Sequence, residues 1–302
     1  MRKVSAVGVL AFIAMAAAGV AQPIPSAVIS DPPPDKVFPA EMAVAAIPSH
    51  GSTMHGVLYL ASGAGPHPAL LLMHGFPGNE QNLDLAQSVR RAGWNVLTFH
   101  YRGSWGSAGA FSFGHALEDA DSAIAFLRDP ANARQYRIDP ARIAVAGHSM
   151  GGLMAAHVGA TDKAIMAVAL ISAWNIGGEA AALRSASDRA QEVKSFAESM
   201  ESLAGCTPES LVAEALAHQT EWNFVTYADA LASRPLLLIT SDDGNAPDSQ
   251  ALTAAVFKAG GKAITEVHFP TDHPYSDHRI ALQAAFVRWL ETLGAVKDIS
   301  RP

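Results

Sequence analysis

The chain has 302 residues and a formal net charge of −7; 49% of its residues are hydrophobic and 16% are charged. This balance suits a well-filled core and argues against disorder. Lys and Arg are scattered without forming a basic patch, which argues against nucleic-acid binding.

The N-terminal stretch differs from the rest of the chain. Arg2 and Lys3 precede an apolar, uncharged run over residues 4–20, and Gly19-Val20-Ala21 offers small residues for a signal peptidase. We therefore expect residues 1–21 to be a signal peptide, and the protein to be exported to the periplasm or secreted. The alternative is an uncleaved anchor, although the run is at the short end for a spanning helix. After cleavage we expect no stable membrane insertion.

Cys206 is the single cysteine of the chain, so an intrachain disulfide is excluded. No activating neighbour can be identified beside it in the sequence. We expect a packed or surface thiol rather than a nucleophile.

The domain organisation follows from composition and periodicity. Residues 22–39 are rich in proline and predict an extended tether without core periodicity. We expect the compact domain to cover residues 40–302. It begins with two short β-type runs, 42–47 and 54–60, around a hairpin signal.

The rest of this domain alternates strands with helices. Further β-type runs lie at 69–73, 95–99, 143–146, 165–172, 236–240 and 264–269. Helical periodicity occurs at 82–92, 117–127 and 277–293. Such alternation predicts an α/β fold with a mostly parallel sheet covered by helices on both faces.

The interval 173–235 breaks this alternation. Small and apolar residues repeat at helical spacing from Leu183 to Ala204, and a second helix is expected to start at Thr207, with Pro208 in its first turn. We interpret residues 176–225 or so as a helical cap over the catalytic face. The alternative is a set of ordinary connecting helices.

The sequence around Ser149 carries most of the functional information. Gly147-His148-Ser149-Met150-Gly151 has the form Gly-x-Ser-x-Gly and follows an apolar β-type run. A serine at a sharp strand-to-helix turn needs small residues two positions before and after it, because strand and helix nearly touch there. Ser149 is therefore the candidate nucleophile, and an ordinary glycine-rich turn is the alternative.

A serine nucleophile needs a base and an orienting acid, which belong on loops at the carboxyl ends of the strands. Asp242 and Asp243 both follow the strand at 236–240. His273 and His278 both follow the last strand, but His278 falls within the start of the final helix. His273 is the favoured base, because its loop can fold back over the sheet, and the order Ser, Asp, His is typical of such a sheet.

Acyl transfer also needs two N–H donors for the developing oxyanion. Met150 lies at the start of the helix after Ser149 and is the first expected donor. The loop His74-Gly75-Phe76-Pro77-Gly78 should supply the second. Pro77 has no N–H, so Phe76 is the expected donor.

Together these segments resemble the α/β-hydrolase superfamily, in its serine esterase and prolyl-oligopeptidase-like (dienelactone-hydrolase-like) group. The resemblance covers residues 40–293. It includes the oxyanion loop 74–78, the segment 137–142, Asp243 with Pro247, and Asp272-His273 with 276–279. It implies an α/β-hydrolase fold, Asp243 rather than Asp242 as the acid, and His273 as the base. Thr240 departs from the family, in which many members have glycine before the acid.

The other histidines show no pairing at metal-ligand spacing. We expect no metal and no cofactor. His74 is expected to shape the oxyanion loop, and His148 to be a packing residue. Ser104-Trp105-Gly106-Ser107 is similar to a motif of proline-releasing peptidases, but it lies away from the nucleophile and carries no catalytic role here.

Three functions remain open from the sequence. The first is an exported serine hydrolase that cleaves a carboxylic ester through an acyl-enzyme. The second is a peptidase or amidase with the same residues, although the large N-terminal propeller of prolyl oligopeptidases has no room here. The third is a non-catalytic binding protein on the same fold. The expected partner is a small ester or peptide, and the sequence does not indicate an oligomeric state.

Overall fold

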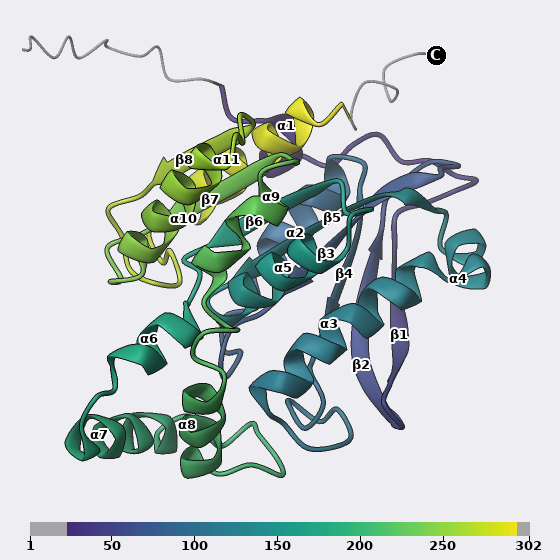
Figure 1. Cartoon of the computed structure of the whole chain (residues 1–302). Coiled ribbons are helices and arrows are strands. Elements are labelled where there is room, and N and C mark those ends of the chain that lie inside the picture. Colours follow the sequence, from purple (N-terminus) through teal and green to yellow (C-terminus); the bar gives the residue numbers. More distant parts are fainter. Residues whose placement is uncertain (1–22, 295–302) are drawn as a thin grey trace, which may run out of the picture.

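An eight-stranded sheet runs through the protein, seen here in a computed structural model that describes residues 23–294 (Figure 1). The expected signal peptide, 1–21, lies outside the described residues. The strands are β1 (Glu41–Ser49), β2 (Ser52–Leu60), β3 (His67–Met73), β4 (Asn95–Phe99), β5 (Ile138–His148), β6 (Ala167–Ile171), β7 (Leu236–Thr240) and β8 (Ile264–His268). Their order in the sheet is β1-β2-β4-β3-β5-β6-β7-β8; β2 runs antiparallel to both of its neighbours, β1 and β4, and all other neighbouring strands are parallel.

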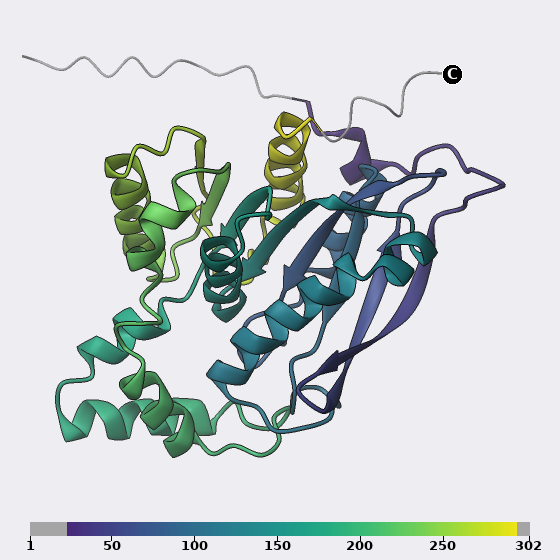
Figure 2. The ribbon, with the colours of Figure 1, turned by 45° about the vertical axis from the view of Figure 1, so that its right-hand side comes forward.

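The helices lie on both faces of this sheet and at one end of it. They are α1 (Ser26–Ile29), α2 (Leu83–Arg91), α3 (Phe113–Arg128), α4 (Pro130–Gln135), α5 (Met150–Thr161), α6 (Ile176–Ala182), α7 (Ala186–Ala197), α8 (Pro208–Ala217), the 3₁₀ turn η1 (Phe224–Tyr227), α9 (Ala228–Leu231), α10 (Ala246–Lys258) and α11 (Arg279–Thr292). Figures 1 and 2 show α2 and α11 on one face and α3 and α5 on the other. The expected α/β architecture is confirmed.

Strand β3 explains why the sheet is covered on both sides. All its residues are buried. Leu70 and Leu72 pack with the helices α2 and α11, whereas Leu71 and Met73 pack with α3 and α5. Successive side chains of a strand point to opposite faces, so a continuous apolar run requires a helical layer on each face. Burial of each such side chain contributes about 1.5–3 kcal/mol.

The described part of the proline-rich segment differs from the expected tether. α1 lies against α2 and α11 rather than extending away from the domain. Arg91 Nε donates to the Ala27 carbonyl at 2.5 Å, and Arg288 Nη2 donates to the Pro23 carbonyl at 3.1 Å. These hydrogen bonds hold the N-terminal segment against the domain. They require no apolar periodicity, so the sequence pattern does not predict this contact.

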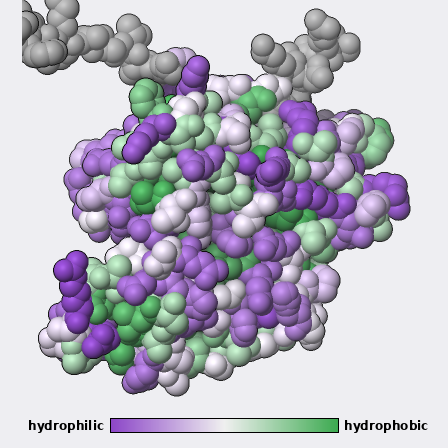
Figure 3. All heavy atoms as spheres, viewed as in Figure 1, coloured by the Kyte–Doolittle hydropathy of each residue, from purple (hydrophilic) through white to green (hydrophobic). Residues whose placement is uncertain are grey.

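The interval between β6 and β7 forms a separate group of helices, α6, α7 and α8, at one end of the sheet (Figures 1 and 2). α8 begins as expected, with Thr207 as N-cap and Pro208 in the first turn. The expected stripe from Leu183 to Ala204 is not one helix. Ser185 caps α7 through its side chain and so begins a new helix there, and α7 ends at Ala197. We call α6–α8 the cap; on the face seen in Figure 3 its surface mixes apolar and polar residues.

A buried ion pair joins the first hairpin to α3. Asp119 is fully buried and accepts hydrogen bonds from Ser49 Oγ at 2.6 Å, Arg102 Nε at 2.6 Å and Arg102 N at 2.8 Å. Its carboxylate therefore links β1, the loop after β4 and α3. A buried carboxylate is tolerated because donors of this kind replace water.

Removing this carboxylate should destabilise the fold. We expect Asp119→Ala to lower the free energy of unfolding by about 3–5 kcal/mol, because three buried donors lose their acceptor (Ser49 Oγ, Arg102 N and Arg102 Nε), and Arg102 is left with the half-exposed Glu118 as an ion-pair partner. Urea denaturation measures this change. On the same helix, Asp121 has a side chain 55% exposed and lies 3.6 Å from His157. Asp121→Ala should therefore cost no more than about 1 kcal/mol, and equal losses in the two variants would contradict the role given to Asp119.

Candidate active site

Ser149 occupies a strained turn between β5 and α5. Its φ of 57° and ψ of −122° are sparsely populated for a residue other than glycine. A Cβ on Gly147 would lie 1.8 Å from the Gly151 carbonyl oxygen, and one on Gly151 would lie 2.2 Å from the Met73 carbonyl oxygen. The two glycines are therefore required by backbone contact, as the motif indicates.

Backbone hydrogen bonds hold this turn in place. Ser149 N donates to the Ile171 carbonyl at 3.0 Å, and the Ser149 carbonyl accepts from Gly152 N and Trp174 N, each at 2.9 Å. The end of β6 thus supports the turn from the side. The serine is 8% exposed.

The structure brings His273 and Asp243 together. His273 Nδ1 lies 2.7 Å from Asp243 Oδ2; the carboxylate side chain is 4% exposed and the imidazole 38%. Asp242 faces away and contacts His268 Nε2 at 3.1 Å with its side chain 65% exposed. His278 is the N-cap of α11 and pairs with Asp277. Of the alternatives open from the sequence, Asp243 and His273 are the pair in contact.

The electrostatics of Asp243 favour its ionised form. Burial alone would raise the pKa of Asp243, but hydrogen bonds from the His273 ring and from the Asn245 backbone N–H outweigh it and hold the pKa below its usual range. Because the ionised Asp243 carboxylate can only accept a hydrogen bond, the proton of the His273 ring is held on Nδ1. Nε2 is left as the acceptor that a general base needs.

In the described part of the chain no hydrogen bond joins the Ser149 hydroxyl to His273, whose ring is bonded to Asp243. Contacts of this type commonly shorten only in the substrate complex.

A cluster of hydroxyl groups lies behind the acid, and nothing in the sequence pattern indicates it. Ser172 Oγ lies 2.8 Å from Tyr275 Oη and 2.9 Å from Ser241 Oγ. Ser172 and Tyr275 are fully buried. Burial raises the pKa of Tyr275 to about 12, so its hydroxyl keeps its proton. Because Ser172 follows β6, Ser241 follows β7 and Tyr275 lies two residues after His273, these hydroxyls join the acid loop to the histidine loop.

His148 also contacts the histidine loop. Its Nε2 lies 2.9 Å from the His273 carbonyl oxygen, and the two rings have centroids 4.5 Å apart. Burial, and then the nearby His273, lower the pKa of His148 to about 3. It is therefore a neutral donor through Nε2–H that fixes the backbone of His273, a more specific role than the expected packing.

The loop 74–78 lies directly against Ser149. A Cβ on Gly75 would lie 2.7 Å from Ser149 Cβ. Met150 is the first residue of α5, so its N–H has no partner within the helix. Within the described chain, neither Phe76 N–H nor Met150 N–H donates to a protein acceptor. Met150 adjoins Ser149 in the chain, and Phe76 follows Gly75, which lies against the Ser149 side chain, so both expected oxyanion donors belong to segments beside Ser149.

Two hydrogen bonds hold the shape of this loop, one from within it and one from Trp105. His74 Nδ1 lies 2.7 Å from the Gly75 carbonyl oxygen, and burial lowers the pKa of His74 to about 4. Trp105 Nε1 donates to the Pro77 carbonyl at 2.7 Å. The segment 104–107 thus supports the oxyanion loop, although it carries no nucleophile.

Aromatic side chains fill the space between the site and the cap. We call them the ring cluster: Phe76, Phe111, Phe113, Trp174, Phe196 and Trp222. Phe111, Phe113, Phe196 and Trp222 are buried, and Phe76 and Trp174 are partly buried beside them. Trp174 and Phe196 are packed against one another, with ring centroids 6.0 Å apart.

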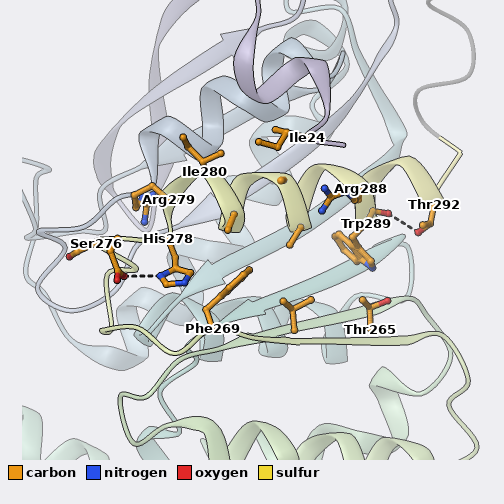
Figure 4. Close-up of a pocket in the computed structure, with 15 residues that line it drawn as sticks. Ile24, Thr265, Phe269, Ser276, His278, Arg279, Ile280, Arg288, Trp289 and Thr292 are labelled. Atoms are coloured by element: carbon orange, nitrogen blue, oxygen red, sulfur yellow. Dashed lines mark hydrogen bonds and ion pairs between the residues drawn. The ribbon is translucent and has the colours of Figure 1, made fainter. Parts of the chain in front are cut away.

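A large groove of the described chain lies away from Ser149. It has a volume of about 830 Å³ and runs between β8 and α11, with Phe269, Ile280 and Trp289 among its lining residues (Figure 4). Its lining includes His278 but not Ser149, Asp243 or His273. Across residues 23–294 no group of three or more His, Cys, Asp or Glu side chains is arranged to hold a metal ion. Nor does any helix in that range have the length and apolarity to cross a membrane.

Comparison with known proteins agrees with this geometry. A sequence model of the alpha/beta hydrolase family matches residues 70–287. The chain therefore belongs to the alpha/beta hydrolase family, and the fold expected from the sequence is confirmed. No curated protein sequence matches the chain.

Several solved structures share the fold. An esterase of Pyrococcus furiosus is similar with a TM-score of 0.63 and 17% identity, covering 87% of this chain and 97% of the esterase. The thermostable carboxylesterase EstE1, from a metagenomic library, gives a TM-score of 0.57 and 22% identity, covering 87% and 91%. A hyperthermophilic esterase of Pyrobaculum calidifontis gives 0.60 and 19%, covering 87% and 85%.

The neutral histidines predict a pH dependence of stability. The pKa of His148 falls from 6.5 to about 3 and that of His74 from 6.5 to about 4, so the unfolded chain binds more protons than the folded chain between these values. We expect the free energy of unfolding to fall with pH from 6.5 towards 4, by at most about 1.4 kcal/mol per pH unit for each histidine.

Urea midpoints at about pH 7 and about pH 5 test this dependence. His148→Gln removes one of the two titrating groups and should reduce the loss of stability between these pH values. The same loss in wild type and variant would contradict the assignment to His148.

Proposed function

We propose that this protein is a serine hydrolase that cleaves a carboxylic ester. The observation that carries the proposal is the 2.7 Å contact of His273 Nδ1 with Asp243, on a loop beside the strained Ser149. In this proposal Ser149 is the nucleophile, His273 the general base and Asp243 its orienting acid. Esterases occur among the structurally similar proteins, so an ester is the first substrate class to test.

The proposed reaction has two halves. Ser149 Oγ attacks the ester carbonyl carbon while its proton passes to His273 Nε2, and the Phe76 and Met150 N–H groups receive the oxyanion. The tetrahedral intermediate collapses, and the leaving alkoxide takes the proton from His273 and departs as the alcohol. The acyl group remains on Ser149.

In the second half water attacks the acyl-enzyme and gives a proton to His273. Collapse of the second intermediate returns this proton to Ser149 and releases the carboxylic acid. The low pKa of Asp243 supports this cycle, because a carboxylate that stays ionised stabilises the imidazolium formed in each half.

We also propose that the protein acts outside the cytoplasm. The proposal depends on the N-terminal pattern of residues 1–21, which ends in Gly19-Val20-Ala21. An N-terminus at Gln22 in protein recovered from the periplasm or medium would support export with cleavage. Recovery of the intact chain from the cytoplasm would contradict it.

The nucleophile is tested by covalent labelling. We expect wild-type protein to react with a fluorophosphonate probe and to hydrolyse p-nitrophenyl acetate, and Ser149→Ala to lose both, because the probe bonds to an activated serine. Ser187, on the outer cap helix α7, provides a matched control. Labelling that persists in Ser149→Ala but is lost in Ser187→Ala would exclude the proposed nucleophile.

The acid is tested by paired amide substitutions. We expect Asp243→Asn to lower kcat by about 10³–10⁴-fold, because a neutral amide no longer fixes the His273 tautomer or stabilises the imidazolium. Asp242→Asn should leave kcat nearly unchanged, since its exposed side chain contacts His268 instead. A larger loss in Asp242→Asn than in Asp243→Asn would reverse the assignment.

A further inference from the structure

We propose that the ring cluster restricts this protein to esters of short acyl groups. The inference rests on the proposed function and adds the substrate class. Three observations support it. They are the direction in which the acyl group must point, the aromatic rings that occupy that side of Ser149, and the hydrogen bonds that hold these rings.

The chemistry sets the direction of the acyl group. His273 must face the leaving oxygen in order to protonate it, so the alcohol part points towards the histidine loop after β8. Phe76 belongs to the loop after β3, and β5, β6 and β7 lie between these two strands in the sheet. The acyl substituent lies on the other side of the carbonyl carbon from the leaving oxygen. It therefore points towards Phe76.

Aromatic rings already occupy that side. The Phe76 ring has its centroid 5.3 Å from Phe196, 5.8 Å from Phe113, 5.9 Å from Phe111 and 6.3 Å from Trp174. These are the separations of aromatic pairs in direct contact. The same residue that offers an oxyanion N–H thus places its side chain in the path of the acyl group.

Little space remains between these rings and the cap. The cavity lined by Trp174, Phe196 and the facing residues of α6 and α8 has a volume of about 10 Å³. This is at or below the roughly 10–15 Å³ that a single water molecule requires. An acyl chain of several methylene groups that reaches this cavity must therefore displace Trp174 or Phe196.

The rings are fixed from both the body and the cap. Trp174 N donates to the Ser149 carbonyl at 2.9 Å, and its indole N–H donates to the Glu179 carboxylate on α6. At the start of α3, Phe113 N donates to Glu214 of α8 at 2.9 Å. The ring cluster is therefore joined by hydrogen bonds to the backbone of Ser149 and to the cap helices α6 and α8.

Backbone hydrogen bonds also join the cap to the loop after β4. Phe111 N donates to the Ala204 carbonyl at 2.8 Å, Ala204 N to Gly103 O at 2.8 Å, and Trp105 N to Ser202 O at 2.9 Å. These bonds oppose a movement of the cap away from the rings.

A second groove, of about 500 Å³, lies outside the oxyanion loop between Pro77, Trp105 and the end of α7, and contains no member of the ring cluster.

The experiment compares p-nitrophenyl esters of increasing acyl length. We expect wild-type kcat/KM to be highest for acetate and butyrate and lower for octanoate by about tenfold or more, since an added methylene that does not fit its pocket costs about that factor. Phe196→Ala removes a ring from the cap side and should raise the octanoate-to-acetate ratio of kcat/KM. Phe196→Leu should raise it less and serves if the alanine variant does not fold.

Phe126→Ala is the matched control. Phe126 is partly buried on the same helix as Phe113 but packs against Tyr136, at a ring distance of 6.2 Å, away from the cluster. This variant should keep the wild-type ratio. An unchanged ratio in both Phe196 variants would overturn the proposal, as would a wild-type enzyme that hydrolyses octanoate as well as acetate.

The acyl direction and the proposed function are tested separately. A parallel series of acetate esters with longer alcohols should be less affected by Phe196→Ala than the acyl series; a larger effect there would overturn the acyl assignment. Absence of fluorophosphonate labelling at Ser149 would remove the proposed function itself. Labelling together with a flat acyl profile would remove only the short-acyl inference.

Discussion

Close backbone approach at the end of β5 is the constraint on which the site depends. β3, β5 and α5 meet there with so little space that Gly75, Gly147 and Gly151 each leave no room for a Cβ. The approach holds Ser149 at its unusual φ and brings the loop 74–78 against its side chain. The strain, of order 1–3 kcal/mol, is sustained by the buried sheet on both sides. The stability of the sheet therefore keeps the Ser149 hydroxyl in one orientation.

Burial of the acid is the second requirement. Asp243 is removed from water but receives donors from His273 and Asn245, so it remains charged where a bare carboxylate would not. The hydroxyls of Ser172, Ser241 and Tyr275 hold the same strand ends together. The His148 ring donates a hydrogen bond to the His273 carbonyl and so fixes the backbone of His273. The candidate base is thus positioned by groups from several different strand ends.

Much of this arrangement is predictable from sequence, for a definite reason. Parallel strands place all their carboxyl ends at one edge of a sheet, so Ser149, Asp243 and His273 can be placed near one another from strand order alone. The choice between Asp242 and Asp243 cannot be made from the residues, because adjacent loop positions point in different directions. The family resemblance favours Asp243, and in the folded chain Asp243 is the residue that contacts His273. The roles of these residues remain our proposal.

Other features have no sequence signature. The hydroxyl cluster combines residues over a hundred positions apart, Ser172 and Tyr275, with no spacing rule to connect them. The apolar stripe from Leu183 to Ala204 predicts one helix, but the capping side chain of Ser185 starts a new one. The N-terminal segment is held by arginine contacts to backbone carbonyls, and such contacts leave no periodic pattern.

The cap leaves the sheet after β6 and returns at β7, and these strands are neighbours in register. Its first and last residues lie close together, because Gly177 N donates to the Trp222 carbonyl at 3.2 Å and Asn175 Nδ2 donates to Asn223 Oδ1 at 3.0 Å. The cap helices add nothing to the ladder of strand hydrogen bonds. A lineage can lengthen, shorten or replace such an insertion while the strands beneath keep their pairing. Selectivity and chemistry can then diverge at separate rates within one gene.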